Sequence, residues 1–254
     1  MKEFTQEFTQ EYVLQAGECN PEGEMPLTLL TRRIIEVATS HADSWGVGYE
    51  RLIKDNTGWV LSRLTIELER YPVVGERYSL TTWIEDYNRH FSQRNMILCD
   101  GEGKAIGYVR SIWMVINFAT RQGVDISQLS YISANVSPRQ CPIEPQSRLR
   151  PLDNVAVSLP YTFAYCDCDF NRHVNTVRYI EHLLNLFPLS RFDSQMVRRM
   201  ELAFLKETRY GDKVNITLAD ADDMDSRLAI TDDEGNDHVR ARLCWTPRQK
   251  TLTP

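Results

Sequence analysis

The chain has 254 residues, a length that fits one large domain or two small ones. Hydrophobic residues make up 42% of it and charged residues 25%, so a hydrophobic core of ordinary size can form. The net charge of −6 argues against bulk binding of nucleic acid, and an acidic partner would need a local basic patch.

The N-terminal segment, residues 1–8, is polar and acidic and contains no apolar run. We therefore predict no signal peptide, no transit peptide, no membrane-spanning segment and a cytoplasmic location. Six cysteines are scattered along a chain that is long enough to fold without disulfides, so we expect free thiols.

The first half of the chain predicts a strand, a helix and four more strands. Residues 11–20 favour a strand, which a turn signal follows. After Pro26, a residue suited to the first turn of a helix, apolar residues recur at helical spacing until the glycines at positions 46 and 48. Strand-forming residues then predominate in four segments, at 59–68, 77–84, 91–99 and 105–118.

The second half repeats this order of elements. A strand is predicted at 155–165, and a helix at 173–187 that Pro188 ends. Four strands follow, at 199–207, 213–219, 227–231 and 238–245.

Short sequences also recur at matching places in the two halves. The hairpin signal Asp-Gly-Glu-Gly at 100–103 returns as Asp-Asp-Glu-Gly at 232–235, and Arg-Ser-Ile-Trp at 110–113 returns as Arg-Leu-Cys-Trp at 242–245. We infer a tandem duplication of one α+β unit, in which an antiparallel sheet wraps a long helix. Two such units in one chain would mimic a symmetric homodimer.

Composition divides the chain into three parts. We predict an N-terminal unit at residues 1–125 and a C-terminal unit at residues 155–254. Between them, residues 126–154 interleave Pro with Ser, Gln and Arg, and form a linker that is too long to be wholly unstructured.

Chemistry-bearing side chains gather just before the helix of the second half. Asp169, Asn171, His173 and Asn175 occupy alternate positions of the segment Asp-Phe-Asn-Arg-His-Val-Asn. A polar capping turn explains one or two of these residues, but not four that include a histidine. The helix start offers backbone N–H groups, those of Val174 and Asn175, as donors for a developing oxyanion.

Two other interpretations use the cysteines next to this segment. Cys166, Cys168 and His173 lack the spacing of a zinc site, and no second cluster of ligands accompanies them, so we predict no metal. Either thiol remains a rival nucleophile with His173 as its base. The sequence has neither a Gly-rich phosphate loop nor a dinucleotide fingerprint, and we predict no cofactor.

The segment resembles the Asp-x-Asn-x-His-x-Asn loop of the acyl-acyl-carrier-protein thioesterases of plants and bacteria. The resemblance covers nearly the whole chain, because that family has two tandem hotdog units and a segment like Trp-Val-Leu-Ser-Arg at 59–63. It implies a pseudo-dimeric double hotdog with an acyl-chain pocket in the first unit. Aromatic and aliphatic side chains there could line the pocket, although an ordinary core role is simpler for most of them: Trp59, Leu61, Trp83 and Trp113.

The resemblance also implies a fourth catalytic residue, Glu207. In plant members a cysteine follows this glutamate, whereas this chain has Thr208, which argues against a cysteine nucleophile there. The equivalent turn of the first unit, residues 20–26, has no histidine. The second unit should therefore carry the one active site.

The resemblance implies a hydrolase that releases free fatty acid from acyl carrier protein and so terminates fatty acid synthesis. Alternatives are an acyl-CoA thioesterase, a hotdog hydratase or dehydratase, and a non-catalytic acyl-carrier binding module. The protein is expected to be a monomer or a homodimer. Arginines near the site are either solvated surface or a patch that docks the acidic carrier protein: Arg172, Arg178, Arg191, Arg198, Arg199 and Arg209.

Overall fold

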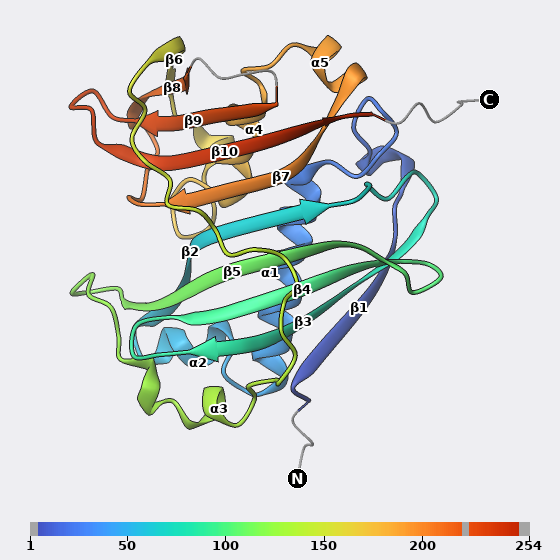
Figure 1. Cartoon of the computed structure of the whole chain (residues 1–254). Coiled ribbons are helices and arrows are strands. Elements are labelled where there is room, and N and C mark those ends of the chain that lie inside the picture. Colours follow the sequence, from blue (N-terminus) through green and yellow to red (C-terminus); the bar gives the residue numbers. More distant parts are fainter. Residues whose placement is uncertain (1–4, 220–223, 249–254) are drawn as a thin grey trace. The chain divides into compact units, whose positions relative to one another are not determined.

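The computed structural model describes residues 5–219 and 224–248. The chain divides into two compact units, residues 1–146 and residues 147–254. Each unit consists of one antiparallel sheet with a helix packed against it. In Figure 1, α1 lies behind the strands of its own sheet, and α4 behind the strands of its own.

Unit 1 contains the predicted strand, helix and four strands, and several short helices that were not predicted. Its elements are β1 (Glu7–Val13), α1 (Leu27–Ser44), α2 (Tyr49–Lys54), β2 (Thr57–Leu68), β3 (Arg77–Tyr87), β4 (Ser92–Asp100) and β5 (Ala105–Asn117). The first strand was predicted too late, because it ends at Val13 and residues 14–20 contain a short 3-10 helix (Ala16–Glu18) instead. The apolar face of α1, with Leu30 and Ile34 fully buried, packs toward β1 and β3.

Unit 2 repeats the same topology. Its elements are β6 (Val155–Thr162), a 3-10 helix (Tyr165–Asp167), α4 (Thr176–Leu184), α5 (Leu189–Ser194), β7 (Gln195–Phe204), β8 (Lys213–Ala219), β9 (Asp225–Thr231) and β10 (Asp237–Pro247). The strands of unit 1 are ordered β1-β3-β4-β5-β2, and those of unit 2 are ordered β6-β8-β9-β10-β7. The two orders are identical when each set is numbered from its first strand, which confirms the predicted duplication.

The recurring hairpin signals form the same turn in both units. Gly103 and Gly235 both have φ of +82°, a left-handed conformation that glycine adopts without steric cost. Each glycine donates its N–H at 3.0 Å to the carbonyl of the aspartate that opens the turn, Asp100 or Asp232. Sequence repetition therefore marks repeated local structure.

The segment between the last strand of unit 1 and the first strand of unit 2 is held by strand side chains. It begins with a 3-10 helix (Ile126–Gln128) and α3 (Ser130–Ser133), and then runs without helix or strand to residue 154. In unit 1, Arg110 of β5 donates to the carbonyls of Cys141 (2.6 Å) and Ile143 (2.7 Å). These two side chains are buried in a cluster with Trp83. The linker is thus ordered over this stretch, as its length required.

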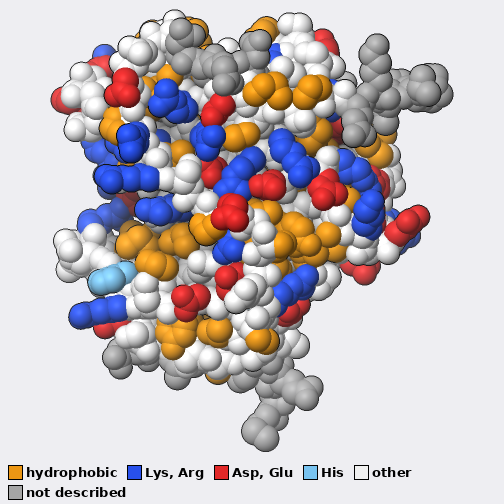
Figure 2. Space-filling model, in the orientation of Figure 1, with side chains coloured by type: hydrophobic (Ala, Val, Ile, Leu, Met, Phe, Trp, Pro, Cys, Tyr) orange, Lys and Arg blue, Asp and Glu red, His pale blue; other side chains and the backbone are white. Residues whose placement is uncertain are grey.

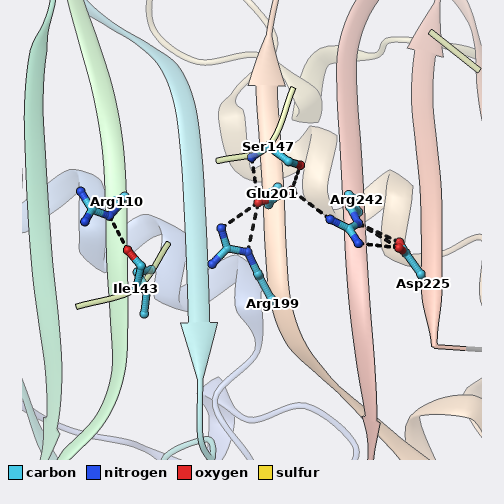
Figure 3. A network of polar contacts seen from close by, with 7 residues as sticks. All are labelled: Arg110, Ile143, Ser147, Arg199, Glu201, Asp225 and Arg242. Atoms are coloured by element: carbon cyan, nitrogen blue, oxygen red, sulfur yellow. Dashed lines mark hydrogen bonds and ion pairs between the residues drawn. The ribbon is translucent and has the colours of Figure 1, made fainter. Parts of the chain in front are cut away.

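In unit 2 the same segment is anchored by a buried carboxylate. Glu201 of β7 is 1% exposed and accepts from the backbone N–H (3.2 Å) and the hydroxyl (2.6 Å) of Ser147. Arg199 and Arg242 approach the same carboxylate, and Arg242 also pairs with Asp225 (Figure 3). The positive and negative charges of this network thus neutralise one another across the strands. More widely, acidic and basic side chains are interspersed on the face drawn in Figure 2.

Candidate active site

The candidate loop joins β6 to α4 and forms a tight, hydrogen-bonded turn. The Asp169 N–H donates to the carbonyl of His173 at 2.8 Å, and the Arg172 N–H donates to the carbonyl of Asp169 at 3.0 Å. Cys168 and Val174 pair across the base of the turn as an antiparallel bridge. Arg172 adopts φ of +63°, which is unusual for a residue with a side chain. The turn fixes residues 169–173 relative to one another.

The carboxylate of Asp169 is oriented by the backbone of its own turn. Its Oδ1 accepts from the N–H of Asn171 at 2.8 Å and from the N–H of His173 at 3.3 Å. This is the Asx arrangement that the capping interpretation anticipates. It accounts for the carboxylate's position and leaves Asn171 with an exposed side chain at the turn.

His173 brings the loop to Glu207. Its Nε2 lies 3.4 Å from Oε2 of Glu207, and the two side chains are 23% and 37% exposed. Glu207 does not belong to a strand, because β7 ends at Phe204 and Glu207 lies in the segment that leads to β8. His173 also pairs with Arg209 as an isolated antiparallel bridge. Backbone pairing therefore aligns the loop with the segment that carries Glu207.

The helix starts later than predicted, and this corrects the expected oxyanion site. α4 begins at Thr176, and Asn175 is its N-cap, with Oδ1 accepting from the N–H of Val177 at 2.9 Å. The N–H of Val174 donates to the carbonyl of Thr208, and that of Asn175 to the carbonyl of Asp167, each at 2.8 Å. The prediction that these two N–H groups stabilise an oxyanion is wrong for this structure, because both already donate within the chain.

A buried carboxylate supports the start of the loop. Asp167 is 5% exposed and accepts from the hydroxyl of Tyr161 (2.9 Å), the N–H of Ala164 (2.8 Å) and Nε2 of His182 (3.1 Å). Burial alone would raise the pKa of Asp167, but these hydrogen bonds outweigh burial and hold its pKa below the ordinary value. Asp167 is thus a structural anion next to the proposed catalytic one. Nothing in its sequence position distinguished it.

The thiol of Cys168, beside the loop, is a poor nucleophile by environment. All six cysteines are free, and the Cys168 thiol donates to the carbonyl of Ala164 at 3.6 Å. Burial raises the pKa of the Cys168 thiol, and the carboxylates of Asp167 and Asp169 raise it further. Because the thiolate is the reactive form, this environment disfavours Cys168 as a nucleophile. Among the described residues, no group of three or more His, Cys, Asp or Glu side chains is placed to hold a metal.

Five of the six arginines of the predicted cluster separate into two kinds of residue, and the sixth, Arg198, is half-buried on β7. Arg199 belongs to the buried Glu201 network, Arg178 forms an ion pair within α4, and Arg191 lies over two aromatic rings. Arg172 and Arg209 are instead exposed, one in the loop and one in the segment that pairs with it. Only these last two combine exposure with a place on the loop and its paired segment.

Unit 1 builds the same turn with different side chains. The Asn20 N–H donates to the carbonyl of Glu24 at 2.8 Å, and Oδ1 of Asn20 accepts the Glu24 N–H at 2.8 Å. Gly23 takes the left-handed position with φ of +74°, and Glu24 pairs with Val73 as an antiparallel bridge. Asn20 and Glu24 therefore occupy the places that Asp169 and His173 occupy in unit 2. The first-unit turn lacks both the aspartate and the histidine.

Solved structures share this fold over nearly the whole chain. An acyl-ACP thioesterase from Bacteroides thetaiotaomicron matches with a TM-score of 0.86 and 32% identity, over 95% of this chain and 98% of that chain. The 12:0-ACP thioesterase from Umbellularia californica matches with a TM-score of 0.85 and 20% identity, over 96% and 98% of the two chains. The fold is thus the α+β fold of two tandem hotdog units.

Family models match both units. The model of the acyl-ACP thioesterase N-terminal domain matches residues 5–130, and that of the C-terminal domain matches residues 152–247. The chain belongs to the acyl-ACP thioesterase family.

A plant relative aligns with most of this chain. The palmitoyl-acyl carrier protein thioesterase of Gossypium hirsutum is 24% identical over 267 residues, which cover 95% of this chain and 64% of that relative. The chain therefore spans about two thirds of the length of that relative. The relative is named as chloroplastic, so the cytoplasmic location is not supported by it and stays a prediction. Within the described residues, no helix is long and apolar enough to cross a membrane.

Proposed function

We propose that this protein hydrolyses the thioester of a fatty-acyl carrier protein and releases free fatty acid and the carrier thiol. The observation that carries the proposal is the 3.4 Å contact between His173 and Glu207 beside the oriented carboxylate of Asp169. Membership of the acyl-ACP thioesterase family supports the reaction class. The names of the relatives support the carrier-bound substrate.

Asp169 is the proposed reacting carboxylate, and two routes are open to it. In the covalent route, a carboxylate oxygen attacks the thioester carbon, the C–S bond breaks, and water then hydrolyses the resulting anhydride. In the direct route, Asp169 accepts a proton from water while the water oxygen attacks the same carbon. Both routes consume one water and yield a carboxylic acid and a thiol.

The remaining polar side chains receive roles that fit their positions. His173 and Glu207 would orient and activate the hydrolytic water, since an imidazole paired with a carboxylate can accept a proton from that water. The side-chain amide of Asn171, exposed at the turn, would donate to the thioester carbonyl oxygen. The side chain of Asn171 thus takes the role predicted for the N–H groups of Val174 and Asn175, both of which donate to carbonyls of the chain.

Carrier docking is assigned to the surface around the loop. Phe170 and Tyr210 are 74% and 69% exposed, and the cations of Arg172 and Arg209 lie next to them in the chain. Exposed aromatic rings offer apolar contact, and exposed guanidinium groups suit the phosphate of a phosphopantetheine arm and an acidic carrier surface. A chain with net negative charge would use such a patch for orientation.

The acyl-chain pocket is assigned to unit 1 on the family resemblance, within the proposed boundaries 1–125, 126–154 and 155–254. Of the four side chains considered for its lining, Trp83 is fully buried and packs with Cys141 and Ile143 of the linker. Trp113 is 8% exposed and donates its indole N–H to Ser111 at 2.9 Å. Both are core residues.

One assay separates the proposal from its alternatives. Purified protein is mixed in turn with acyl carrier protein charged with a fatty acid, with the matching acyl-CoA, and with enoyl substrates, and free thiol is followed with a chromogenic reagent. The proposal predicts thiol release, faster from the carrier protein. Faster release from acyl-CoA indicates an acyl-CoA thioesterase, loss of enoyl absorbance without thiol a hydratase, and tight binding without either a carrier-binding module.

A further inference from the structure

A chain of three buried polar side chains lies next to Glu207. Thr208 is fully buried, and its Oγ1 lies 2.7 Å from Nδ1 of His238, which is 3% exposed. Nε2 of His238 lies 3.4 Å from Oδ2 of Asp232. The same Asp232 oxygen accepts from the ammonium group of Lys206 at 2.8 Å. With Lys206 added, this series of hydrogen-bonded side chains begins and ends at the two residues that flank Glu207 in sequence.

The direction of each hydrogen bond in this series follows from the partners of its members. Hydrogen bonds from Lys206 and Asn236 hold the pKa of Asp232 well below its ordinary value, so Asp232 is an anion and accepts the Nε2–H of His238. In the neutral imidazole, Nδ1 of His238 is then the acceptor, and the hydroxyl of Thr208 donates to it. In this series of hydrogen bonds from Thr208 through His238 to Asp232, each donor thus meets an acceptor.

The order hydroxyl, imidazole, carboxylate is also that of a nucleophilic triad. Burial excludes that role here, because a side chain with no exposed surface cannot reach a thioester carbon. These side chains can instead have a structural role, because the backbone of Thr208 hydrogen-bonds to the loop that carries His173. The carbonyl of Thr208 accepts the N–H of Val174, directly after His173, at 2.8 Å.

The backbone on the other side of Glu207 is tied to the same histidine. The N–H groups of Leu205 and Lys206 donate to the carbonyl of His238 at 2.8 and 3.3 Å. Glu207 therefore lies outside a strand, partly exposed, between two residues, Lys206 and Thr208, that hydrogen bonds to His238 of β10 hold in place.

We propose that Thr208 and His238 are positioning residues, which hold Glu207 at the distance from His173 that hydrolysis requires. The inference rests on the proposed function, in which Glu207 and His173 act together. Displacing a reacting group by about 1 Å can cost 100-fold in rate, so loss of one anchoring hydroxyl is expected to lower kcat roughly 10-fold. Substrate binding, and hence KM, should change little.

The test compares two substitutions at one site with a matched control. Thr208→Val removes the hydroxyl at nearly constant volume, and Thr208→Ser keeps it. Thr217→Val removes the hydroxyl of another buried threonine, which donates to the carbonyl of Ala229 at 3.1 Å, between β8 and β9. We expect Thr208→Val to lower kcat about 10-fold at unchanged KM, Thr208→Ser to stay within about 2-fold of wild type, and Thr217→Val to leave kcat unchanged. Equal kcat for Thr208→Val and wild type overturns the inference.

A double variant and a spectroscopic readout complete the test. If Thr208 acts through Glu207, Thr208→Val costs nothing further in a Glu207→Gln background, whereas two full and additive losses contradict the inference. The imidazole ring signals of His173 in NMR spectra should move in the same direction in Thr208→Val as in Glu207→Gln, and stay in place in Thr208→Ser. Unmoved His173 signals in Thr208→Val overturn positioning even if wild type proves to have no thioesterase activity, an outcome that the thiol assay alone reveals.

Discussion

The two units contain the same turn, but the turn of unit 1 lacks the aspartate and the histidine that the turn of unit 2 carries. In unit 1, Asn20 accepts the Glu24 N–H, and Gly23 takes the left-handed position. In unit 2, Asp169 accepts the N–H of His173 in the same way. In both turns the first residue donates its N–H to the carbonyl of the last residue, and its side-chain oxygen accepts the N–H of that last residue. The fold therefore builds the same backbone turn twice, and a few side chains make one of the two copies a candidate active site.

The largest expected effect comes from making the unit 2 turn like that of unit 1. Asp169→Asn keeps the oxygen that accepts the N–H groups of Asn171 and His173, so the turn should persist. It removes the negative charge needed for attack or for proton abstraction. We expect kcat for thiol release to fall roughly 1,000-fold, with the melting temperature nearly unchanged. A variant that unfolds would show that the carboxylate has a structural role that an amide cannot fill.

Breaking the contact between the loop and its partner segment should cost somewhat less. His173→Ala and Glu207→Gln each remove one member of the pair that is 3.4 Å apart. We expect each to lower kcat roughly 100-fold, and the double variant to lose little more than either single one, because the two side chains act together. Glu24→Ala is the matched change in unit 1 and should leave kcat unaltered. Steady-state thiol release measures all four, and wild-type rates in the two single variants would refute the pair's role.

The two units should also respond to acid in different pH ranges. His41 of α1 is fully buried, and burial, with the nearby Arg94 cation, lowers its pKa from 6.5 to about 4. As the pH falls below 6.5 the unfolded chain binds this proton first, so the folded state loses stability between pH 6.5 and about 4. The loss is at most about 3 kcal/mol. Asp167 in unit 2 has a lowered pKa, so its contribution persists to pH values below the ordinary 3.8 of an aspartate.

Urea unfolding at pH 7.5 and pH 5 measures this difference. Wild type should lose more free energy of unfolding between the two pH values than His41→Gln, which has no proton to gain at that site. An Asp167→Asn variant should show its full destabilisation at both pH values, since the carboxylate is ionised in the folded protein at each of them. The same pH dependence in wild type and His41→Gln would contradict the assignment to His41.

The smallest effect concerns the left-handed position itself. Arg172 holds φ of +63° where unit 1 has a glycine. Arg172→Gly should raise the free energy of unfolding by roughly 0.5 to 1 kcal/mol, and Gly23→Ala should lower it by a similar amount. A Cβ at Gly23 meets no atom within 4 Å, so backbone conformation alone causes the loss. Thermal unfolding checks both, and a destabilised Arg172→Gly would mean that the arginine side chain outweighs the strain.

The helices, strands and hairpins are predicted well from the sequence, because each of them depends on a local pattern of residues. Apolar residues at helical spacing predict α1, and the recurring hairpin signals predict the duplication. The start of α4 was predicted three residues early, because Val174 continues the apolar pattern of the helix although it pairs with Cys168 in a bridge. Asp169, Asn171 and His173 were found because they are neighbours in sequence.

The rest of the site depends on contacts between distant segments. Glu207 was identified only through the family resemblance, since a glutamate near a strand end is usually a solvated charge. Asp167 and His182 gave no signal, and neither did Thr208, His238 and Asp232 as a group. Thr208 and His238 meet because β7 and β10 pair in antiparallel register, with Phe204 opposite Val239. Because β8 and β9 lie between β7 and β10 in the chain, no hairpin turn fixes this register.

The central claim is that catalysis belongs to side chains of one turn and not to the frame that both units share. Thiol release from one acyl carrier protein substrate, measured side by side for Asp169→Asn and Asn20→Asp, tests it most directly. The account predicts a loss of roughly 1,000-fold in the first variant and wild-type activity in the second. Wild-type activity in Asp169→Asn, or an equal loss in both variants, would contradict it.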